Sequence, residues 1–178
     1  MNITINIYEF DLNNIYYLDP IKNTVIENSN FIRLLYSNNI VSLNGIYILL
    51  NFKNVSIINN NNKIRYCFEI NNLDNINTIT LIKNLENDLL KNSIIKNKRP
   101  FYKLKDQLNQ GYIKIFNFLF MHDKYLNSNL DNDLNFNLDN NENFILKISG
   151  IWESDNDFGL TYKILKIKNK LTIGSKKL

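Results

Sequence analysis

The chain has few of the residues that build disulfide scaffolds, zinc centres and hydrolytic sites. Its 178 residues include one cysteine, Cys67, and one histidine, His122. A single cysteine excludes an intramolecular disulfide, and a zinc site or a His–Cys nucleophilic pair would depend on that one histidine. No phosphate-binding P-loop, dinucleotide-binding glycine pattern or Gly-x-Ser-x-Gly motif occurs. We therefore expect no enzyme activity and no cofactor.

Glycine, proline and long apolar runs are also scarce. The sequence contains five glycines and two prolines. No apolar stretch reaches the roughly 18 residues that suggest a membrane helix, and the first 20 residues lack a basic start followed by an apolar core. We expect an intracellular protein without a membrane partner. A hydrophobic content of 44% supports the core of a single domain over residues 1–178.

Charge is distributed unevenly along the chain, although the net charge is only +4. Residues 123–143 form an acidic, asparagine-rich insert, whereas residues 158–178 are basic. Within the insert, Asp131, Asp133, Asp139 and Glu142 are spread among Asn and Leu, without the glycine-anchored spacing of a calcium loop. The pattern favours an acidic loop, and a metal-dependent nuclease is the weakest alternative.

Most of the chain has the two-residue alternation of β-strands. Residues 11–30 are polar and predict a loop with little regular structure, so residues 1–30 form an N-terminal extension. Strands are predicted at residues 2–10, 31–36, 41–52, 53–58, 63–70 and 111–120, and in a hairpin over 144–168.

One amphipathic helix interrupts the strands. Between residues 76 and 92, Ile79, Ile82, Leu85 and Leu89 recur at helical spacing, while Glu86 falls on the opposite, polar side. Asp74 or Asn75 is available to cap its first turn.

The hairpin over 144–168 is the most regular stretch and carries Trp152, the only tryptophan. Strict alternation places Trp152 on the same face as Phe144 and Ile148, which predicts that it is largely buried. In the second arm, Thr161 and Lys163 fall on one face and Tyr162 falls on the other. Either the hairpin belongs to the core with an ordinary solvated face, or it presents aromatic and basic side chains to a ligand.

A basic, aromatic stretch covers residues 91–105. Six cations and no acid occur there, together with Phe101 and Tyr102. Cations attract phosphates and flat rings stack on bases, so the stretch suits a nucleic-acid site. A solvated basic loop whose rings enter the core explains it equally well.

Four segments together resemble a known family. These are FIRLLY (31–36), LNGIY (43–47), PFYKLKDQLNQGYIKIF (100–116) and ISGIWESDNDFGLTYKI (148–164). They resemble single-stranded DNA-binding proteins with an OB fold from nucleocytoplasmic large DNA viruses. The similarity runs from about Phe31 onward and is most specific in the last segment. Residues 1–30 and the acidic insert have no counterpart.

The resemblance implies a mainly β fold with one principal helix, an OB-like Greek-key β-barrel with inserted loops. It also implies a sequence-tolerant single-stranded DNA-binding protein for viral DNA replication, recombination or repair, in the host cytoplasm or a viral replication compartment. The sequence leaves open whether the chain also forms a homo-oligomer. The alternative is a virus structural or assembly subunit that uses the barrel for protein contacts. The candidate nucleic-acid-binding residues are Lys96, Lys98, Arg99, Phe101, Tyr102, Lys103, Lys105, Trp152, Tyr162 and Lys163.

Overall fold

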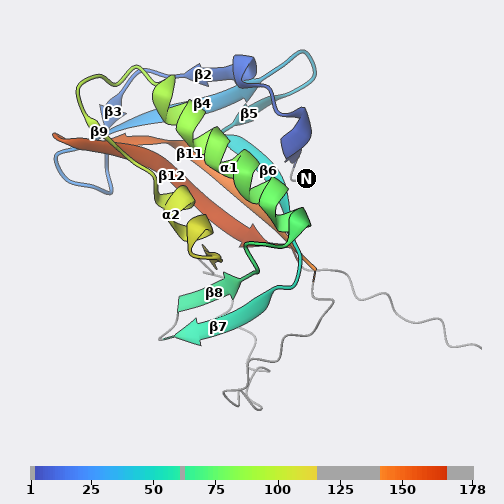
Figure 1. The fold of residues 1–178 in the computed structure, drawn as a ribbon. Helices are drawn as coiled ribbons and strands as arrows, with labels where there is room; N and C mark the ends of the chain where they lie inside the picture. The colour runs from blue at the N-terminus through green and yellow to red at the C-terminus, as the bar shows by residue number, and fades with distance from the viewer. Residues whose placement is uncertain (1–2, 61–62, 116–140, 168–178) are drawn as a thin grey trace, which may run out of the picture.

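The computed structural model describes residues 3–60, 63–115 and 141–167, and strands dominate them as expected (Figure 1). In chain order the elements are β1 (Ile5–Asn6), η1 (Ile7–Glu9), η2 (Leu12–Asn14), β2 (Ile15–Tyr17), β3 (Ile21–Lys22), β4 (Asn30–Ser37), β5 (Ser42–Asn44), β6 (Ile46–Phe52), β7 (Ser56–Asn60), β8 (Lys63–Cys67), α1 (Leu73–Lys91), β9 (Arg99–Phe101), α2 (Lys103–Asn109), β10 (Tyr112–Ile115), β11 (Glu142–Glu153) and β12 (Asp157–Lys166).

The strands form one large sheet and one small sheet. The large sheet follows the order β1-β6-β11-β12-β9, with β2, β3 and β5 joined to it through β4, and the small sheet has the order β10-β8-β7. Among the described residues this order closes no barrel, because the main path ends at β1 and β9. The mainly β fold with one long helix is confirmed in this coarser form. The second helix, α2, lies in the basic stretch and was not expected.

The helix α1 matches the amphipathic pattern and crosses one side of the large sheet (Figure 1). Its four predicted apolar positions are buried: Ile79, Ile82, Leu85 and Leu89. The helix begins three residues before the predicted start, and its cap is Asn72. The Asn72 side chain accepts hydrogen bonds from the backbone N–H groups of Asp74 (3.0 Å) and Asn75 (3.4 Å).

Asn75, one of the two expected caps, instead ties the helix start to both sheets. Its side chain is completely buried. Its Oδ1 accepts from the backbone N–H of Lys53 (2.8 Å), and its Nδ2 donates to the carbonyls of Lys53 (3.0 Å) and Glu69 (2.9 Å). Because buried amides are stable only when they are hydrogen-bonded, Asn75 fixes α1 against the ends of β6 and β8.

Glu86 was expected on the polar side of the helix but is buried. Its carboxylate accepts hydrogen bonds from the backbone N–H groups of Leu104 (3.0 Å) and Lys105 (2.7 Å). These N–H groups belong to the first turn of α2, where the chain supplies no local side-chain cap. Burial raises the pKa of the Glu86 carboxyl above its usual value, although the two hydrogen bonds act in the opposite direction. Glu86 therefore caps α2 from a neighbouring element.

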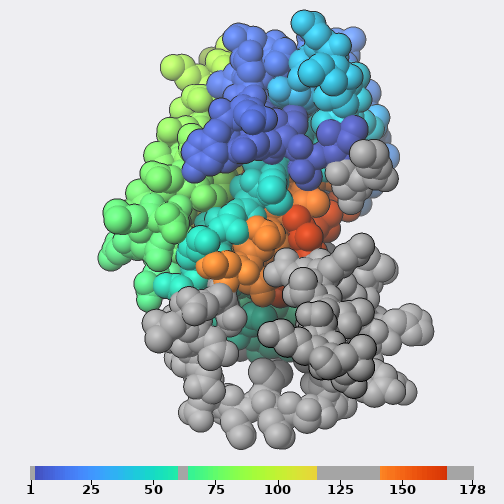
Figure 2. All heavy atoms as spheres, turned by 90° about the vertical axis from the view of Figure 1, so that its right-hand side faces the viewer, coloured from blue at the N-terminus to red at the C-terminus, as the bar shows by residue number. Residues whose placement is uncertain are grey.

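The N-terminal extension is ordered along the large sheet rather than forming a strand over 2–10 (Figure 2). Only Ile5–Asn6 pairs with β6, in parallel. The Asn6 side chain accepts from the backbone N–H of Tyr8 (3.1 Å), which turns the chain into η1. Such local side-chain bonds compete with strand pairing. Residues 11–30, expected as a loop, contribute η2, β2 and β3.

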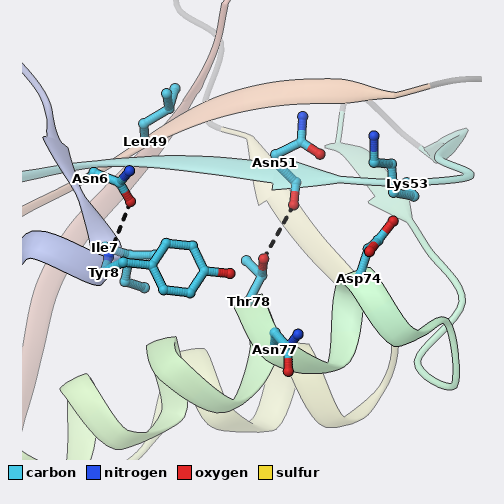
Figure 3. Close-up of a pocket in the computed structure, with 9 residues that line it drawn as sticks. All are labelled: Asn6, Ile7, Tyr8, Leu49, Asn51, Lys53, Asp74, Asn77 and Thr78. Atoms are coloured by element: carbon cyan, nitrogen blue, oxygen red, sulfur yellow. Dashed lines mark hydrogen bonds between the residues drawn. The ribbon is translucent and has the colours of Figure 1, made fainter.

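Two further contacts hold the extension and β6 against α1. The Tyr17 hydroxyl donates to the carbonyl of Leu89 (3.0 Å), and burial raises the pKa of this phenol to about 12. On the other side, the Thr78 hydroxyl donates to the Asn51 carbonyl of β6 at 3.4 Å (Figure 3).

The capping role of Glu86 predicts a change in stability. Replacing Glu86 with Ala leaves the buried Leu104 N–H and the partly buried Lys105 N–H without this acceptor, and an unsatisfied buried group costs about 1–3 kcal/mol. Urea denaturation is expected to show this loss of unfolding free energy, while Asn87→Ala on the exposed side of the same helix changes it little.

The raised pKa of Glu86 also predicts a pH dependence. A carboxyl whose folded pKa is raised binds its proton more tightly in the folded state. Relative to Glu86→Gln, wild-type stability is expected to be greatest below the usual carboxyl pKa. It should fall as the pH rises through the raised value. If the unfolding free energies of the two proteins depended on pH in the same way, the Glu86 carboxyl would not have a raised pKa.

Candidate nucleic-acid interface

The hairpin of β11 and β12 is confirmed, but a β-bulge at Ser149 divides β11 into two halves. Ile148 pairs with Tyr162 and Gly150 pairs with Thr161, so Ser149 is the extra residue of β11 and has no partner in β12. At the same place β11 exchanges one neighbour for another: its first half pairs with β6, and its second half pairs with β4.

The bulge reverses which side chains of the second half face the core. A shift of one residue moves a strand's side chains to the opposite face. Ile151 is completely buried, whereas Trp152 is only half-buried and lies outside the core cluster. The prediction that Trp152 continues the face of Phe144 and Ile148 is therefore wrong. We call the side of the large sheet opposite the core and the helices the outer face, and Trp152 lies on it.

Three aromatic side chains lie in a line across the strands of the outer face. Phe31 of β4 pairs with Trp152 of β11, Trp152 pairs with Gly159 of β12, and Gly159 pairs with Phe101 of β9. The ring centroids of Phe101 and Trp152 are 6.4 Å apart, with the ring planes at 59°. We call Phe31, Trp152 and Phe101 the aromatic row.

Glycine leaves the space that the rings occupy. A Cβ added to Gly159 would lie 3.1 Å from the Trp152 ring, and one added to Gly150 would lie 2.6 Å from the Phe31 ring. Because neither position has a side chain, the Trp152 ring approaches Gly159 and the Phe31 ring approaches Gly150. Phe101 remains 49% exposed at the edge of the row.

Basic side chains lie on the outer face beside the aromatic row. Arg33 pairs with Gly150, and Lys147 pairs with both Lys163 and Tyr47. The Lys147 ammonium is 4.9 Å from the centroid of the Tyr47 ring. Within the described ranges, none of these three cations forms a salt bridge. We call Arg33, Lys147 and Lys163 the basic band.

Negative charge is nearly absent from the outer-face positions of these strands. Strand pairing places one described carboxylate there, Asp157, opposite Arg99. Arg99 Nε binds Asp157 Oδ1 at 2.7 Å. Among the described residues, the outer face therefore combines the half-buried rings of Phe31 and Trp152 and the exposed ring of Phe101 with a basic band outside any salt bridge. This composition suits the binding of a single strand.

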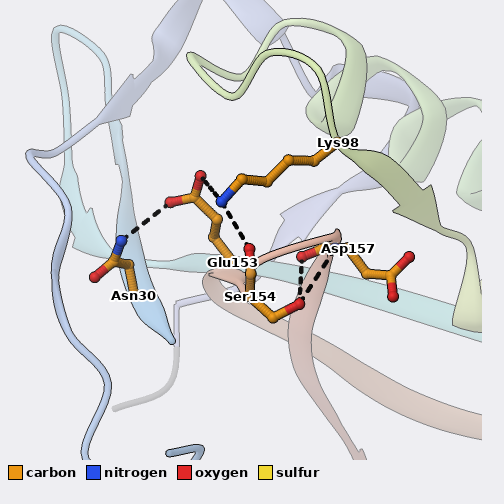
Figure 4. Close-up of polar contacts among 5 residues, drawn as sticks. All are labelled: Asn30, Lys98, Glu153, Ser154 and Asp157. Atoms are coloured by element: carbon orange, nitrogen blue, oxygen red, sulfur yellow. Dashed lines mark hydrogen bonds and ion pairs between the residues drawn. The ribbon is translucent and has the colours of Figure 1, made fainter. Parts of the chain in front are cut away.

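Lys98 was predicted to contact phosphate but binds the hairpin instead (Figure 4). Its Nζ is 2.9 Å from Glu153 Oε1 and donates to the Ser154 carbonyl at 2.7 Å. Glu153 also accepts from Asn30 Nδ2 at 3.3 Å. Both charged groups are mostly buried, with side chains 25% and 15% exposed. Lys98 therefore anchors the segment before β9 to the turn of the hairpin.

Tyr162 and Tyr102 were predicted to stack on bases, but both pack against the core. The Tyr162 hydroxyl accepts a hydrogen bond from Gln107 Nε2 at 2.6 Å. Burial and the nearby Glu86 raise the Tyr162 pKa far above its usual value. Tyr102 precedes α2, and the centroid of its ring lies 5.3 Å from the Lys105 ammonium nitrogen.

The other seven predicted residues divide into two groups. Arg99, Phe101, Trp152 and Lys163 lie on the outer face. Lys96 lies in the connection before β9, and Lys103 and Lys105 belong to the first turn of α2. None of these three lysines lies on a strand of the outer face, and α2 lies on the core side of the sheet (Figure 1).

Four outer-face residues were not among the predicted site residues: Phe31, Arg33, Tyr47 and Lys147. Each occupies the non-core position of an alternating strand, and that alternation is visible in the sequence. The strand pairing that places them beside Trp152 is not, because β4 and β11 are more than 100 residues apart.

The described residues also bear on metal binding and membrane spanning. No group of three or more His, Cys, Asp or Glu side chains there could hold a metal ion. Asp131, Asp133, Asp139 and His122 lie outside the described residues, and Glu142 binds Lys166 Nζ at 2.6 Å. In the same ranges, no helix is long and apolar enough to cross a membrane.

Comparisons with family models, curated proteins and solved structures found no match to this chain. The resemblance to viral single-stranded DNA-binding proteins therefore stays a prediction.

The ion pair of Lys98 predicts a structural rather than a binding role. Lys98→Ala leaves the largely buried Glu153 without its cation, and we expect a loss of about 1–3 kcal/mol in unfolding free energy. The exposed Lys96 is the matched control, and Lys96→Ala should change stability by less than about 0.5 kcal/mol. Chemical denaturation measures both, and equal stability of the two variants would refute this role.

Proposed function

We propose that this protein binds single-stranded DNA on its outer face without strong sequence preference and without cleaving it. The observation that carries the proposal is the aromatic row beside the unpaired cations of the basic band. Bases would stack on Trp152, Phe101 and Phe31, and phosphates would contact Arg33, Lys147 and Lys163. The resemblance adds the preference for DNA over RNA and a role in viral DNA replication, recombination or repair.

The distance between the row and the band suits a strand that contacts both. Along β4, Arg33 is two residues from Phe31, or about 7 Å at the usual rise per residue. Along β12, Lys163 is four residues from Gly159, or about 13 Å. Long basic side chains shorten both distances, so phosphates on one side of the stacked bases come within reach of the band.

Tolerance of sequence follows from the composition of the row. Every base offers a flat face to an aromatic ring. Reading base identity requires polar side chains directed at base edges. The row consists of rings and glycines, so it contributes stacking without an array for reading edges.

An OB-like barrel is part of the same proposal. Two features support it: the sheet bends where β11 passes from β6 to β4, and α1 lies across the side opposite the outer face. Gly45 lies between β5 and β6 and has a φ of 102°, a backbone conformation that residues with a side chain rarely adopt. A crystal structure of the whole chain is expected to show strand pairing that closes this bent sheet.

Stacking is tested by changing the aromatic row. Trp152→Ala and Phe101→Ala are each expected to weaken binding of a labelled oligonucleotide about 5- to 100-fold, because one stacked base is worth ~1–3 kcal/mol. The slope of log affinity against log salt should stay nearly unchanged. Tyr102→Phe is a control that retains the core ring and should leave affinity unaltered. Fluorescence anisotropy measures affinity, and circular dichroism verifies folding.

Phosphate contact is tested by changing the basic band. Replacing Arg33, Lys147 and Lys163 with Ala is expected to weaken binding similarly on every sequence. The salt slope should flatten by about 2, since each phosphate contact on a single strand contributes roughly 0.7.

The matched control removes the same number of charges elsewhere. Replacing Lys96, Lys103 and Lys105 with Ala gives the same net charge without touching the outer face. If both triple variants weaken binding equally, the protein attracts the strand through its overall positive charge and not through contacts with the basic band. If no oligonucleotide binds at all, the proposal fails and the assembly-subunit alternative gains most.

A further inference from the structure

A groove lies at the β6 edge of the large sheet, between the N-terminal extension, β6 and α1. It has a volume of about 470 Å³, within the range that small-molecule sites usually have. Figure 3 shows the Tyr8 ring in this groove, between the strand and the helix. Tyr8 is 69% exposed.

The Tyr8 ring is presented by an ordered turn. Asn6 pairs with Leu49 of β6, and its side chain caps η1 by accepting from the Tyr8 N–H at 3.1 Å. Ile7 packs against the core beneath. A ring so exposed on a capped turn gains little from burial, which leaves its flat face free for a ligand.

Polar groups with different hydrogen-bonding abilities surround the ring. Asn51 and Asn77 offer amides that both donate and accept, Asp74 offers an acceptor and Lys53 a cation. Within the described residues, neither Asp74 nor Lys53 belongs to a salt bridge. A nucleotide matches this set, since its base has a flat face and polar edges and its phosphate is anionic.

The groove continues the outer face along β6. Leu49 pairs with Ile145 and Asn51 with Asn143 on β11, so both line the outer face as well as the groove. From Trp152 to Asn143 is nine residues along β11, or about 30 Å. A strand that lies on the aromatic row and follows β11 past the basic band would arrive at Tyr8.

We propose that the groove binds one nucleotide of the single strand, with its base stacked on Tyr8 between the amides of Asn51 and Asn77, and its phosphate toward Lys53. This inference rests on the proposed function and adds a second, distant contact to it. The groove, unlike the aromatic row, offers polar groups to a base edge, so the weak base preference that the proposed function allows would arise here.

The experiment compares oligonucleotides of two lengths. A tetranucleotide is too short to reach from the aromatic row to the groove, whereas a dodecanucleotide spans both. Tyr8→Ala is expected to weaken the dodecanucleotide about 10-fold or more and to leave the tetranucleotide unchanged. Trp152→Ala should weaken both. Ile40→Ala, in the turn between β4 and β5 where Ile40 is 93% exposed, should change neither.

A second measurement uses deoxyadenosine monophosphate alone. In NMR titration, the amide signals of Asn77 and Thr78 are expected to shift, and Tyr8→Ala and Asn77→Asp should abolish the shift. Asn77→Asp changes an exposed helix position, so the variant is expected to fold.

The outcomes separate this inference from the proposed function. If Tyr8→Ala binds the dodecanucleotide as wild type does while Trp152→Ala weakens it, the groove inference is overturned and the proposed function stands. If no oligonucleotide binds, the proposed function fails and the titration decides the groove alone. Shifts that depend on Tyr8 would support it, and their absence would overturn it.

Discussion

The side-chain alternation of β11 slips by one residue at Ser149, and the division of the molecule into a core side and an outer face depends on that slip. Before the bulge, Phe144 and Ile148 face the helices. After it, Ile151 takes over this role and Trp152 turns outward. Strand bulges commonly redirect a side chain in this way. Without the bulge the tryptophan would enter the core, and the aromatic row would lose its central ring.

The elements that the sequence predicted correctly are those that local periodicity determines. The apolar spacing of α1 and the alternation of the β11–β12 hairpin both lie within a single stretch of chain. The elements that were missed depend on partners distant in sequence or on side-chain bonds. The turn at η1 exists because Asn6 caps it. The helix α2 begins in a basic stretch because Glu86, from another helix, accepts its first free N–H groups.

The candidate site was predictable in composition and not in arrangement. Phe101 and Trp152 were recognised as aromatic residues near cations, and both lie on the outer face. Lys98 and Tyr162 have equally suitable chemistry, but a carboxylate and a buried amide already engage them. Nothing in the local sequence around Lys98 reveals Glu153, which is 55 residues away. Only the pairing of β4 with β11 brings Phe31 beside Trp152.

Photochemical cross-linking tests the central claim, that the outer face holds the nucleic acid, most directly. An oligodeoxynucleotide containing 5-bromodeoxyuridine is irradiated in complex with the full-length protein, and the linked residues are identified by mass spectrometry. If the nucleic acid lies on the outer face, links form to Trp152, Phe101 or Phe31. Links confined to the first turn of α2, around Lys103 and Lys105, would contradict it and place the strand on the opposite side of the sheet.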